Sequence, residues 1–271
     1  MSRMLCYLSS EPLPLADAVG DAVLAEFAGL ARLHADGWGT AWRDARTGEI
    51  RVAGSATTPV GGEEWTRAME PASTSRLLYL RFASRGAPPA AENVQPFLRG
   101  GAAFQHNGLI APRADLLGLL PTEEESALRG TTDSEAYFAA VRSTARPVRG
   151  FPGASTVAAA VAGVRARFTD ACLNAMLLTD SALMIVHAAG TRGAPLAAFA
   201  DRGFDADGLP PGHGDGYNVL RSTVSARGAR VIATTGIDQE SWTRLDDETV
   251  FSVSPGGLAP TRMPARGARH P

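Results

Sequence analysis

Residues 34–39 read HADGWG, which is richer in polar residues and glycine than a core strand needs. Taken alone, the stretch fits a polar turn that buries Trp38. Three further stretches of this kind follow it in order: RFASRG at residues 81–86, QHNG at residues 105–108 and TTDSE at residues 131–135. The four stretches together, more than any one of them, indicate the class of protein.

Each of the later stretches has both a structural and a chemical interpretation. An arginine at a strand end, as Arg81 is, is usually a solvated charge, but its guanidinium fork also suits a carboxylate. The HNG of residues 106–108 is typical of a turn, and it can equally aim a side-chain amide and a backbone N–H at one point, as an oxyanion hole requires. Thr132 and Glu135 have the spacing of a capping box, which leaves the carboxylate of Asp133 free to bind an ammonium group.

The first ten residues, MSRMLCYLSS, contain two candidate nucleophiles. Removal of the initiator Met leaves the hydroxyl of Ser2 beside a free α-amine, whereas the thiol of Cys6 is the better intrinsic nucleophile. On a strand that rises about 3.3 Å per residue, Cys6 lies about 13 Å from Ser2 and cannot reach the same carbonyl. Cys6 would serve only if the chain were cut after Leu5, so we expect Cys6 and Cys172 to be buried core thiols.

Composition excludes several classes of function. The chain has 271 residues, a formal net charge of -2 and no lysine, so it has neither the field of a nucleic-acid-binding protein nor a Schiff-base, Walker or kinase lysine. Neither the two cysteines nor the histidines show the spacing of a metal site, and we expect no metal or cofactor. With no signal peptide and no run of about 20 apolar residues, we expect a cytoplasmic protein that does not bind membranes.

Hydrophobic periodicity predicts a chain of mixed α and β structure. Helices are expected over Val19–Leu33, Ser134–Thr144 and Thr156–Phe168. Strands are expected over Arg3–Leu8, Gly39–Arg43, Leu77–Phe82, Ala102–Gln105, Leu173–Leu178, Ala182–His187, Ala229–Ala233 and Thr249–Val253. Many of these strands follow one another without a helix between them, which argues against a doubly wound parallel sheet.

The four stretches, in this order behind a small residue at position 2, resemble the class II glutamine amidotransferases of the N-terminal nucleophile hydrolase superfamily. The likeness is greatest to small stand-alone members, including the γ-glutamyl amidohydrolase of ergothioneine biosynthesis. These typically begin Met-Cys-Arg and then carry H-x-DGWG, R-x-A-S/T, N-x-HPF, HNG and TDSE. The resemblance is specific from residue 1 to about residue 137 and looser at residues 173–180 and 231–245. It implies an α+β fold, a four-layer αββα sandwich over residues 2–255. The Gly/Pro-rich composition of residues 256–271 predicts a flexible tail there.

The resemblance also implies a role for each matching residue. Ser2 takes the position of the nucleophile, and its own α-amine acts as the general base. Arg81 pairs with the α-carboxylate of a glutamyl group and Asp133 accepts the α-ammonium. Asn107 and the backbone N–H of Gly108 stabilise the tetrahedral oxyanion.

Two supporting residues and two departures from the family pattern remain. His106 is expected to support the turn and Trp38 to fill space, and both are placed beside the substrate. Ser2 stands where the family has Cys, and a hydroxyl is harder to activate than a thiol. Gln95 stands where N-x-HPF has His, so it keeps hydrogen bonding but loses the titratable ring.

The function that follows is hydrolysis of a γ-glutamyl amide, either glutamine or a γ-glutamyl-conjugated metabolite, through a γ-glutamyl ester of Ser2. Three alternatives stay open: a glutaminase that supplies ammonia to a partner synthase, a Cys-to-Ser variant that has lost activity, and a glutamyl-binding protein without turnover. Specificity for the amine part is expected to come from the irregular stretches Val60–Ser73 and Gly203–Gly216.

Overall fold

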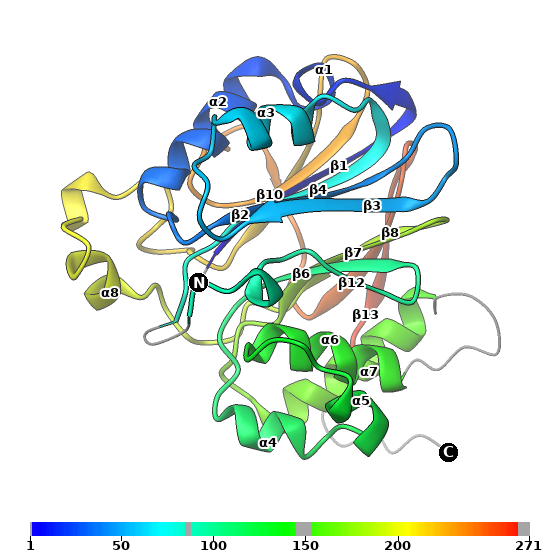
Figure 1. Ribbon diagram of the computed structural model, residues 1–271, viewed down its shortest axis with the longest axis vertical. Helices are drawn as coiled ribbons and strands as arrows, with labels where there is room; N and C mark the ends of the chain where they lie inside the picture. The colour runs from blue at the N-terminus through cyan, green and yellow to red at the C-terminus, as the bar shows by residue number, and fades with distance from the viewer. Residues whose placement is uncertain (1, 85–87, 145–152, 265–271) are drawn as a thin grey trace.

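The strands of the protein form two antiparallel sheets in a computed structural model that describes residues 2–84, 88–144 and 153–264 (Figure 1). In spatial order, the first sheet comprises β11 (Thr243–Arg244), β9 (Leu220–Val224), β10 (Arg230–Thr234), β1 (Arg3–Leu13), β4 (Ser73–Leu80), β2 (Trp38–Arg43) and β3 (Ile50–Ser55). The second sheet comprises β13 (Gly257–Arg262), β12 (Thr249–Ser254), β8 (Leu183–His187), β7 (Asn174–Thr179), β6 (Ala102–Asn107) and β5 (Phe97–Arg99).

Strand β1 lies in the middle of the first sheet because it is apolar on both faces. Leu5 and Tyr7 pack in the hydrophobic cluster under the helices that cover this sheet. Met4 and Cys6 point the other way and join the cluster between the two sheets, together with Met176 of β7. Alternation of side chains along the strand therefore serves two cores at once.

Helices cover the outer face of each sheet. The first sheet carries α1 (Leu15–Val19), α2 (Asp21–Gly29) and α3 (Glu63–Met69), and the second carries α4 (Arg113–Leu117), α5 (Thr122–Ser126), α6 (Asp133–Thr144) and α7 (Ala154–Arg167) (Figure 1). A short helix, α8 (Leu196–Ala200), lies to one side. The predicted four-layer αββα sandwich is therefore confirmed. Among the described residues, no helix is long and apolar enough to cross a membrane.

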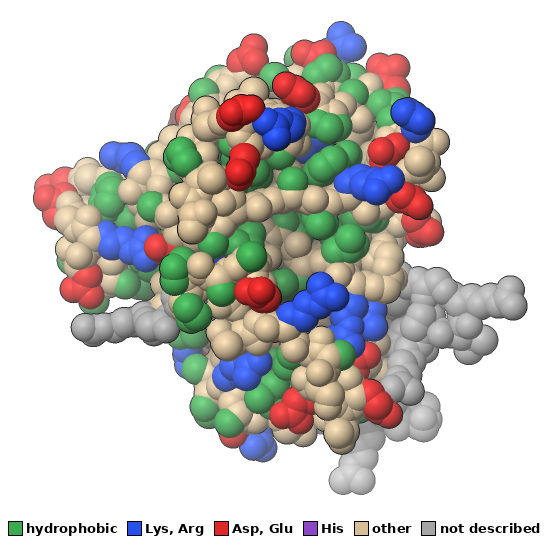
Figure 2. Space-filling model, viewed as in Figure 1, with side chains coloured by type: hydrophobic (Ala, Val, Ile, Leu, Met, Phe, Trp, Pro, Cys, Tyr) green, Lys and Arg blue, Asp and Glu red, His purple; other side chains and the backbone are tan. Residues whose placement is uncertain are grey.

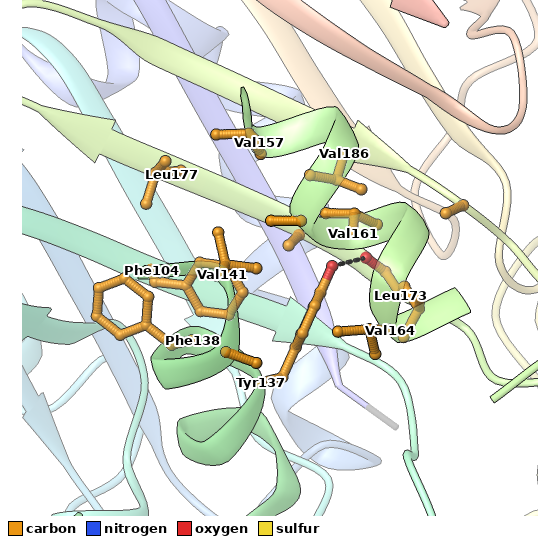
Figure 3. Packing of buried hydrophobic residues seen from close by; sticks show 14 of the residues in the cluster. Phe104, Tyr137, Phe138, Val141, Val157, Val161, Val164, Leu173, Leu177 and Val186 are labelled. Carbon is orange, nitrogen blue, oxygen red and sulfur yellow. Dashed lines mark hydrogen bonds between the residues drawn. The ribbon is translucent and has the colours of Figure 1, made fainter. Parts of the chain in front are cut away.

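The core beneath α6 and α7 holds the end of β6 in place (Figure 3). The rings of Phe104 and Phe138 stack with their centroids 4.8 Å apart. Tyr137 donates a hydrogen bond to the carbonyl oxygen of Leu173 at 3.2 Å, just before β7. Strand β6, which ends at Asn107, is thus anchored from the helical side by aromatic packing.

The structure differs from the sequence-based expectation at several places. The helix expected over Val19–Leu33 is interrupted at Gly20, whose φ of 92° suits glycine, and continues as α2 and a 3-10 helix. Strands β3, β5, β9, β11 and β13 were not predicted, because strands near a sheet edge are partly exposed and lack a continuous apolar run. Residues 257–262 pair with β12 as β13, so they are not part of a loose tail. The expected tail residues 265–271 lie outside the described residues.

Candidate active site

A pocket of about 200 Å³ lies where β1 begins and where β4 and β6 end. Its lining includes five residues singled out from the sequence: Ser2, Arg81, His106, Gly108 and Asp133. Antiparallel pairing of Arg3 with Leu80 brings the start of β1 to the end of β4, which explains how residues 2 and 81 meet. The described lining contains no residue of Val60–Ser73 or Gly203–Gly216, the stretches expected to set specificity.

Ser2 is buried and held from three directions. Its hydroxyl oxygen accepts a hydrogen bond from the hydroxyl of Tyr79 at 2.6 Å and another from the backbone N–H of Phe82 at 3.1 Å. Its carbonyl oxygen accepts a hydrogen bond from Nδ2 of Asn107, which is itself buried beside Ser2. Sequence reasoning missed Tyr79, because a tyrosine on an apolar strand has the pattern of a core residue.

The HNG turn is fastened to the segment before β7. The ring nitrogens of His106 lie 2.9 Å from the Ser134 hydroxyl and 3.0 Å from the carbonyl oxygen of Cys172. A carbonyl only accepts, so Nε2 carries the proton, and burial lowers the pKa of His106 and keeps the ring neutral. The thiol of Cys172 donates to the carbonyl oxygen of Asn107 at 3.0 Å. A Cβ at Gly108 would lie 1.9 Å from the Cys172 carbonyl oxygen, so the turn needs glycine.

The HADGWG stretch shapes the loop that carries Arg81. The Asp36 carboxylate accepts a hydrogen bond from the backbone N–H of Ala83 at 2.6 Å and pairs with Arg202 at 2.5 Å. The Asp36 carbonyl oxygen accepts from the Arg81 guanidinium at 3.3 Å. Gly37 has a φ of 127°, which suits glycine at this turn. The motif was recognised in the sequence, but the role of its aspartate comes only from these contacts.

Asp133 lies at the start of α6 with one carboxylate oxygen already engaged. Its Oδ2 accepts a hydrogen bond from the backbone N–H of Ile110 at 2.6 Å. The capping box is confirmed in part, since the backbone N–H of Glu135 donates to the hydroxyl of Thr132 at 3.2 Å. The Glu135 carboxylate instead accepts from the backbone N–H groups of Arg129 and the next residue, at 2.8 and 2.7 Å, and so orders the loop before the helix.

Three other residues considered in the sequence do not line the pocket. Trp38 is buried against Trp65 with ring centroids 5.2 Å apart, and its indole N–H donates to the carbonyl of Thr58 at 3.1 Å. It belongs to the core under α3 and does not contribute to the pocket lining. Cys6 and Cys172 are buried free thiols, and burial raises the pKa of Cys6 strongly and that of Cys172 to about 12.

Two histidines that show no metal spacing in the sequence form a buried pair. The Nε2 atoms of His34 and His213 lie 2.9 Å apart, and both rings pack against Phe199. Burial holds the pKa of His34 well below its usual range and lowers that of His213 to about 3. The pair is therefore neutral at pH 7, and one ring donates to the other.

A larger groove of about 670 Å³ lies between the edge strands β3 and β5. Hydrophobic side chains gather in the band between the two sheets, flanked by arginine and glutamate (Figure 2). Gln95, whose side chain is buried, is among the lining residues of both this groove and the pocket that contains Ser2.

Two antiparallel sheets packed face to face between helical layers define the fold of the N-terminal nucleophile hydrolases. The chain itself belongs to the class-II glutamine amidotransferases, whose family model matches residues 19–271. The general chemistry of that family is hydrolysis of a glutamine amide. No curated protein matched the sequence.

Solved structures share the fold at low sequence identity. A glutamine aminotransferase class-II domain protein from Silicibacter pomeroyi is 19% identical, with a TM-score of 0.60 over 96% of this chain and 99% of that chain. Glutamine phosphoribosylpyrophosphate amidotransferase from B. subtilis is 14% identical, with a TM-score of 0.55 over 97% of this chain and 49% of that chain. A structure described as a predicted glutamine amidotransferase from Pseudomonas aeruginosa is 15% identical, with a TM-score of 0.50 over 95% and 94% of the two chains.

Proposed function

We propose that the protein hydrolyses a γ-glutamyl amide through the hydroxyl of Ser2, after removal of Met1. The observation that carries this proposal is one pocket of about 200 Å³ that Ser2 shares with an arginine, a carboxylate and a glycine turn. These groups supply a nucleophile, a clamp for an amino-acid end and a donor for an oxyanion. Membership of the class-II glutamine amidotransferases supports the same chemistry.

Arg81 and Asp133 recognise the amino-acid end of the glutamyl group. Among the described residues, the Arg81 guanidinium donates long hydrogen bonds, 3.3 and 3.4 Å, to the carbonyl oxygens of Asp36 and Pro88, and a guanidinium has further donors for a substrate carboxylate. Asp133 uses Oδ2 for the backbone of Ile110, so Oδ1 accepts the α-ammonium. Neither contact involves the amide substituent, so amides larger than glutamine are accepted.

The chemical steps use groups that already surround Ser2. The α-amine takes the proton of its own hydroxyl as Oγ forms a bond to the γ-carbonyl carbon. The oxyanion meets the N–H of Gly108 and the second N–H of the Asn107 amide, whose first N–H holds the Ser2 carbonyl. The C–N bond then breaks and the amine leaves with the transferred proton. Water hydrolyses the γ-glutamyl ester, which releases glutamate and restores the hydroxyl.

The test combines intact mass with turnover of γ-glutamyl p-nitroanilide. We expect the purified protein to lack the mass of Met1 and to release nitroaniline, and we expect Ser2→Ala to abolish the release. Ser10→Ala is the matched control, since Ser10 is an exposed serine further along β1. Retention of Met1 in an active preparation, or full activity of Ser2→Ala, would refute the mechanism.

A second candidate is glutamine hydrolysis that supplies ammonia to a separate synthase. It is favoured by the likeness to the B. subtilis amidotransferase, of which this chain spans 49%. A kcat/KM for glutamine well above that for bulkier γ-glutamyl amides, together with co-purification of a synthase, would select this candidate over the first.

A further inference from the structure

The hydroxyl oxygen of Ser2 has two hydrogen-bond donors pointing at it. Tyr79 donates at 2.6 Å, which is at the short end for a bond between two hydroxyl groups, and the backbone N–H of Phe82 donates at 3.1 Å. A hydroxyl oxygen has two lone pairs, so both are occupied. The Ser2 proton is then the only part of the hydroxyl that is left for a base.

The direction of the Tyr79 hydrogen bond is set by Gln95. The Gln95 Oε1 accepts a hydrogen bond from the backbone N–H of His106 at 2.6 Å, which fixes the amide with its oxygen toward His106. Its Nε2 consequently donates to the Tyr79 oxygen at 2.8 Å. Tyr79 has a single proton and already accepts from Gln95, so that proton goes to Ser2. Burial raises the pKa of Tyr79, so it keeps the proton at neutral pH.

Gln95 is held in place by close backbone packing. A Cβ on Gly39 would lie 1.9 Å from the Gln95 carbonyl oxygen, so strand β2 accepts the Gln95 backbone only because residue 39 is glycine. Gln95 itself is buried and lies between the large groove and the pocket. The second glycine of HADGWG therefore seats the residue that orients Tyr79.

We propose that Tyr79 is a catalytic residue that activates the Ser2 hydroxyl by donating a hydrogen bond to it, and that Gln95 positions Tyr79. The hydrogen-bonded chain from Gln95 through Tyr79 to Ser2, called the relay below, selects a hydroxyl over a thiol as nucleophile. The inference rests on the proposed function, in which Ser2 is the nucleophile. As the proton leaves, negative charge develops on Oγ, and both donors stay hydrogen-bonded to that atom. Their stabilisation of the charge compensates for the difficulty of activating a hydroxyl. Sulfur is larger and a weak acceptor, so a thiol gains little from donors placed at these distances.

The relay also connects the two positions at which this sequence departs from the family pattern. Ser2 stands where relatives carry Cys, and Gln95 stands where the N-x-HPF motif carries His. In the structure both side chains are hydrogen-bonded to the same phenol hydroxyl, that of Tyr79. The departures are thus parts of one arrangement rather than two independent losses.

The first experiment compares Tyr79→Phe with Tyr7→Phe on γ-glutamyl p-nitroanilide. Tyr79→Phe removes one donor to the reacting oxygen, so we expect kcat to fall about 100-fold with KM unchanged. Tyr7 is a buried tyrosine in the same sheet whose hydroxyl donates to the backbone at Leu13 and Ser73, at 3.3 and 3.1 Å, so Tyr7→Phe should leave kcat within about 2-fold. Equal kcat for Tyr79→Phe and the wild type would overturn the proposal.

Gln95→Glu separates a positioning role from a merely structural one. An ionised Glu accepts the Tyr79 proton and takes it away from Ser2, whereas a protonated Glu donates as Gln does. We expect the ratio of its kcat to that of the wild type to rise as the pH falls, and the double variant with Tyr79→Phe to be no slower than Tyr79→Phe alone. A pH-independent ratio, or additive losses in the double variant, would contradict the relay.

Ser2→Cys tests the preference for a hydroxyl. We expect this variant to be slower than the wild type, and a gain of tenfold or more would overturn the selectivity. Labelling of Ser2 by a glutamine-like diazoketone, followed by intact mass, provides a readout that does not require turnover. If the wild type hydrolyses no γ-glutamyl amide, the proposed function fails. The labelling rate of Ser2 still tests the relay, because labelling should be slower in Tyr79→Phe than in Tyr7→Phe. Equal labelling rates, or no labelling of Ser2, would refute it.

Discussion

Replacement of Gly108 by Ala tests whether the HNG turn is built as the structure shows. The added Cβ would lie 1.9 Å from the Cys172 carbonyl oxygen and 2.4 Å from Nε2 of His106. Ordinary contact begins near 3.4 Å, so the turn and the segment before β7 must separate by about 1.5 Å. A shift of that size breaks the hydrogen bonds from His106 to Cys172 and from Cys172 to Asn107, each 3.0 Å long.

The cost follows from these contacts. Overpacking in a close-packed interior costs about 1–3 kcal/mol, and each hydrogen bond lost adds about 0.5–1.5 kcal/mol. We therefore expect Gly108→Ala to lower the free energy of unfolding by about 2–6 kcal/mol. The proposed oxyanion donor, the backbone N–H of residue 108, moves with the turn, and a displacement of about 1 Å is enough to reduce kcat about 100-fold.

Urea unfolding and turnover of γ-glutamyl p-nitroanilide measure the two effects separately. Gly163→Ala is the control, because Gly163 lies on an exposed face of α7 and an added Cβ there meets nothing within 4 Å. That change should raise the free energy of unfolding by about 0.5–1 kcal/mol through helix propensity. If Gly108→Ala were as stable and as active as the wild type, the described contacts of the turn would be wrong.

Three further predictions concern charge and pH. Asp133→Asn should raise KM for a γ-glutamyl substrate about 10-fold or more, because a charged hydrogen bond to the ammonium is lost, while the urea midpoint stays within error. The free energy of unfolding should fall below pH 6.5, because His34 and His213 bind protons in the unfolded chain but not in the buried pair. Each histidine lowers it by about 1.4 kcal/mol per pH unit, and for His213 this continues down to its pKa of about 3. His213→Gln should reduce this slope by one such contribution in urea titrations between pH 6 and pH 4. Asp36→Ala should loosen the Arg81 loop by removing the acceptor of the Ala83 N–H, and so raise KM more than it lowers kcat in steady-state assays.

Local pattern was sufficient for the elements that carry a long apolar run or a clear helical spacing. Strands β6, β7 and β8 and helices α6 and α7 lie close to their predicted ranges, because long apolar runs and helical spacing leave few alternatives. Strand β1 begins at Arg3 as predicted but continues to Leu13, five residues beyond the predicted end. The edge strands β3 and β13 were missed, since a half-exposed strand lacks that signal. Gly20 breaks a helix that the apolar spacing alone would continue, because spacing carries no information on a positive φ.

The sequence by itself determined the four ordered motifs and, through them, the family and the αββα fold. It could not determine how distant residues meet. The contacts of Tyr79 with Ser2, of Cys172 with the HNG turn and of His34 with His213 join residues 77, 65 and 179 positions apart, and they depend on strand register and packing between layers. A buried tyrosine, cysteine or histidine has the same local sequence pattern whether or not its polar atom is hydrogen-bonded to a distant residue. Only the tertiary structure, in which each buried polar group needs a partner, decides which of them face the hydroxyl of Ser2.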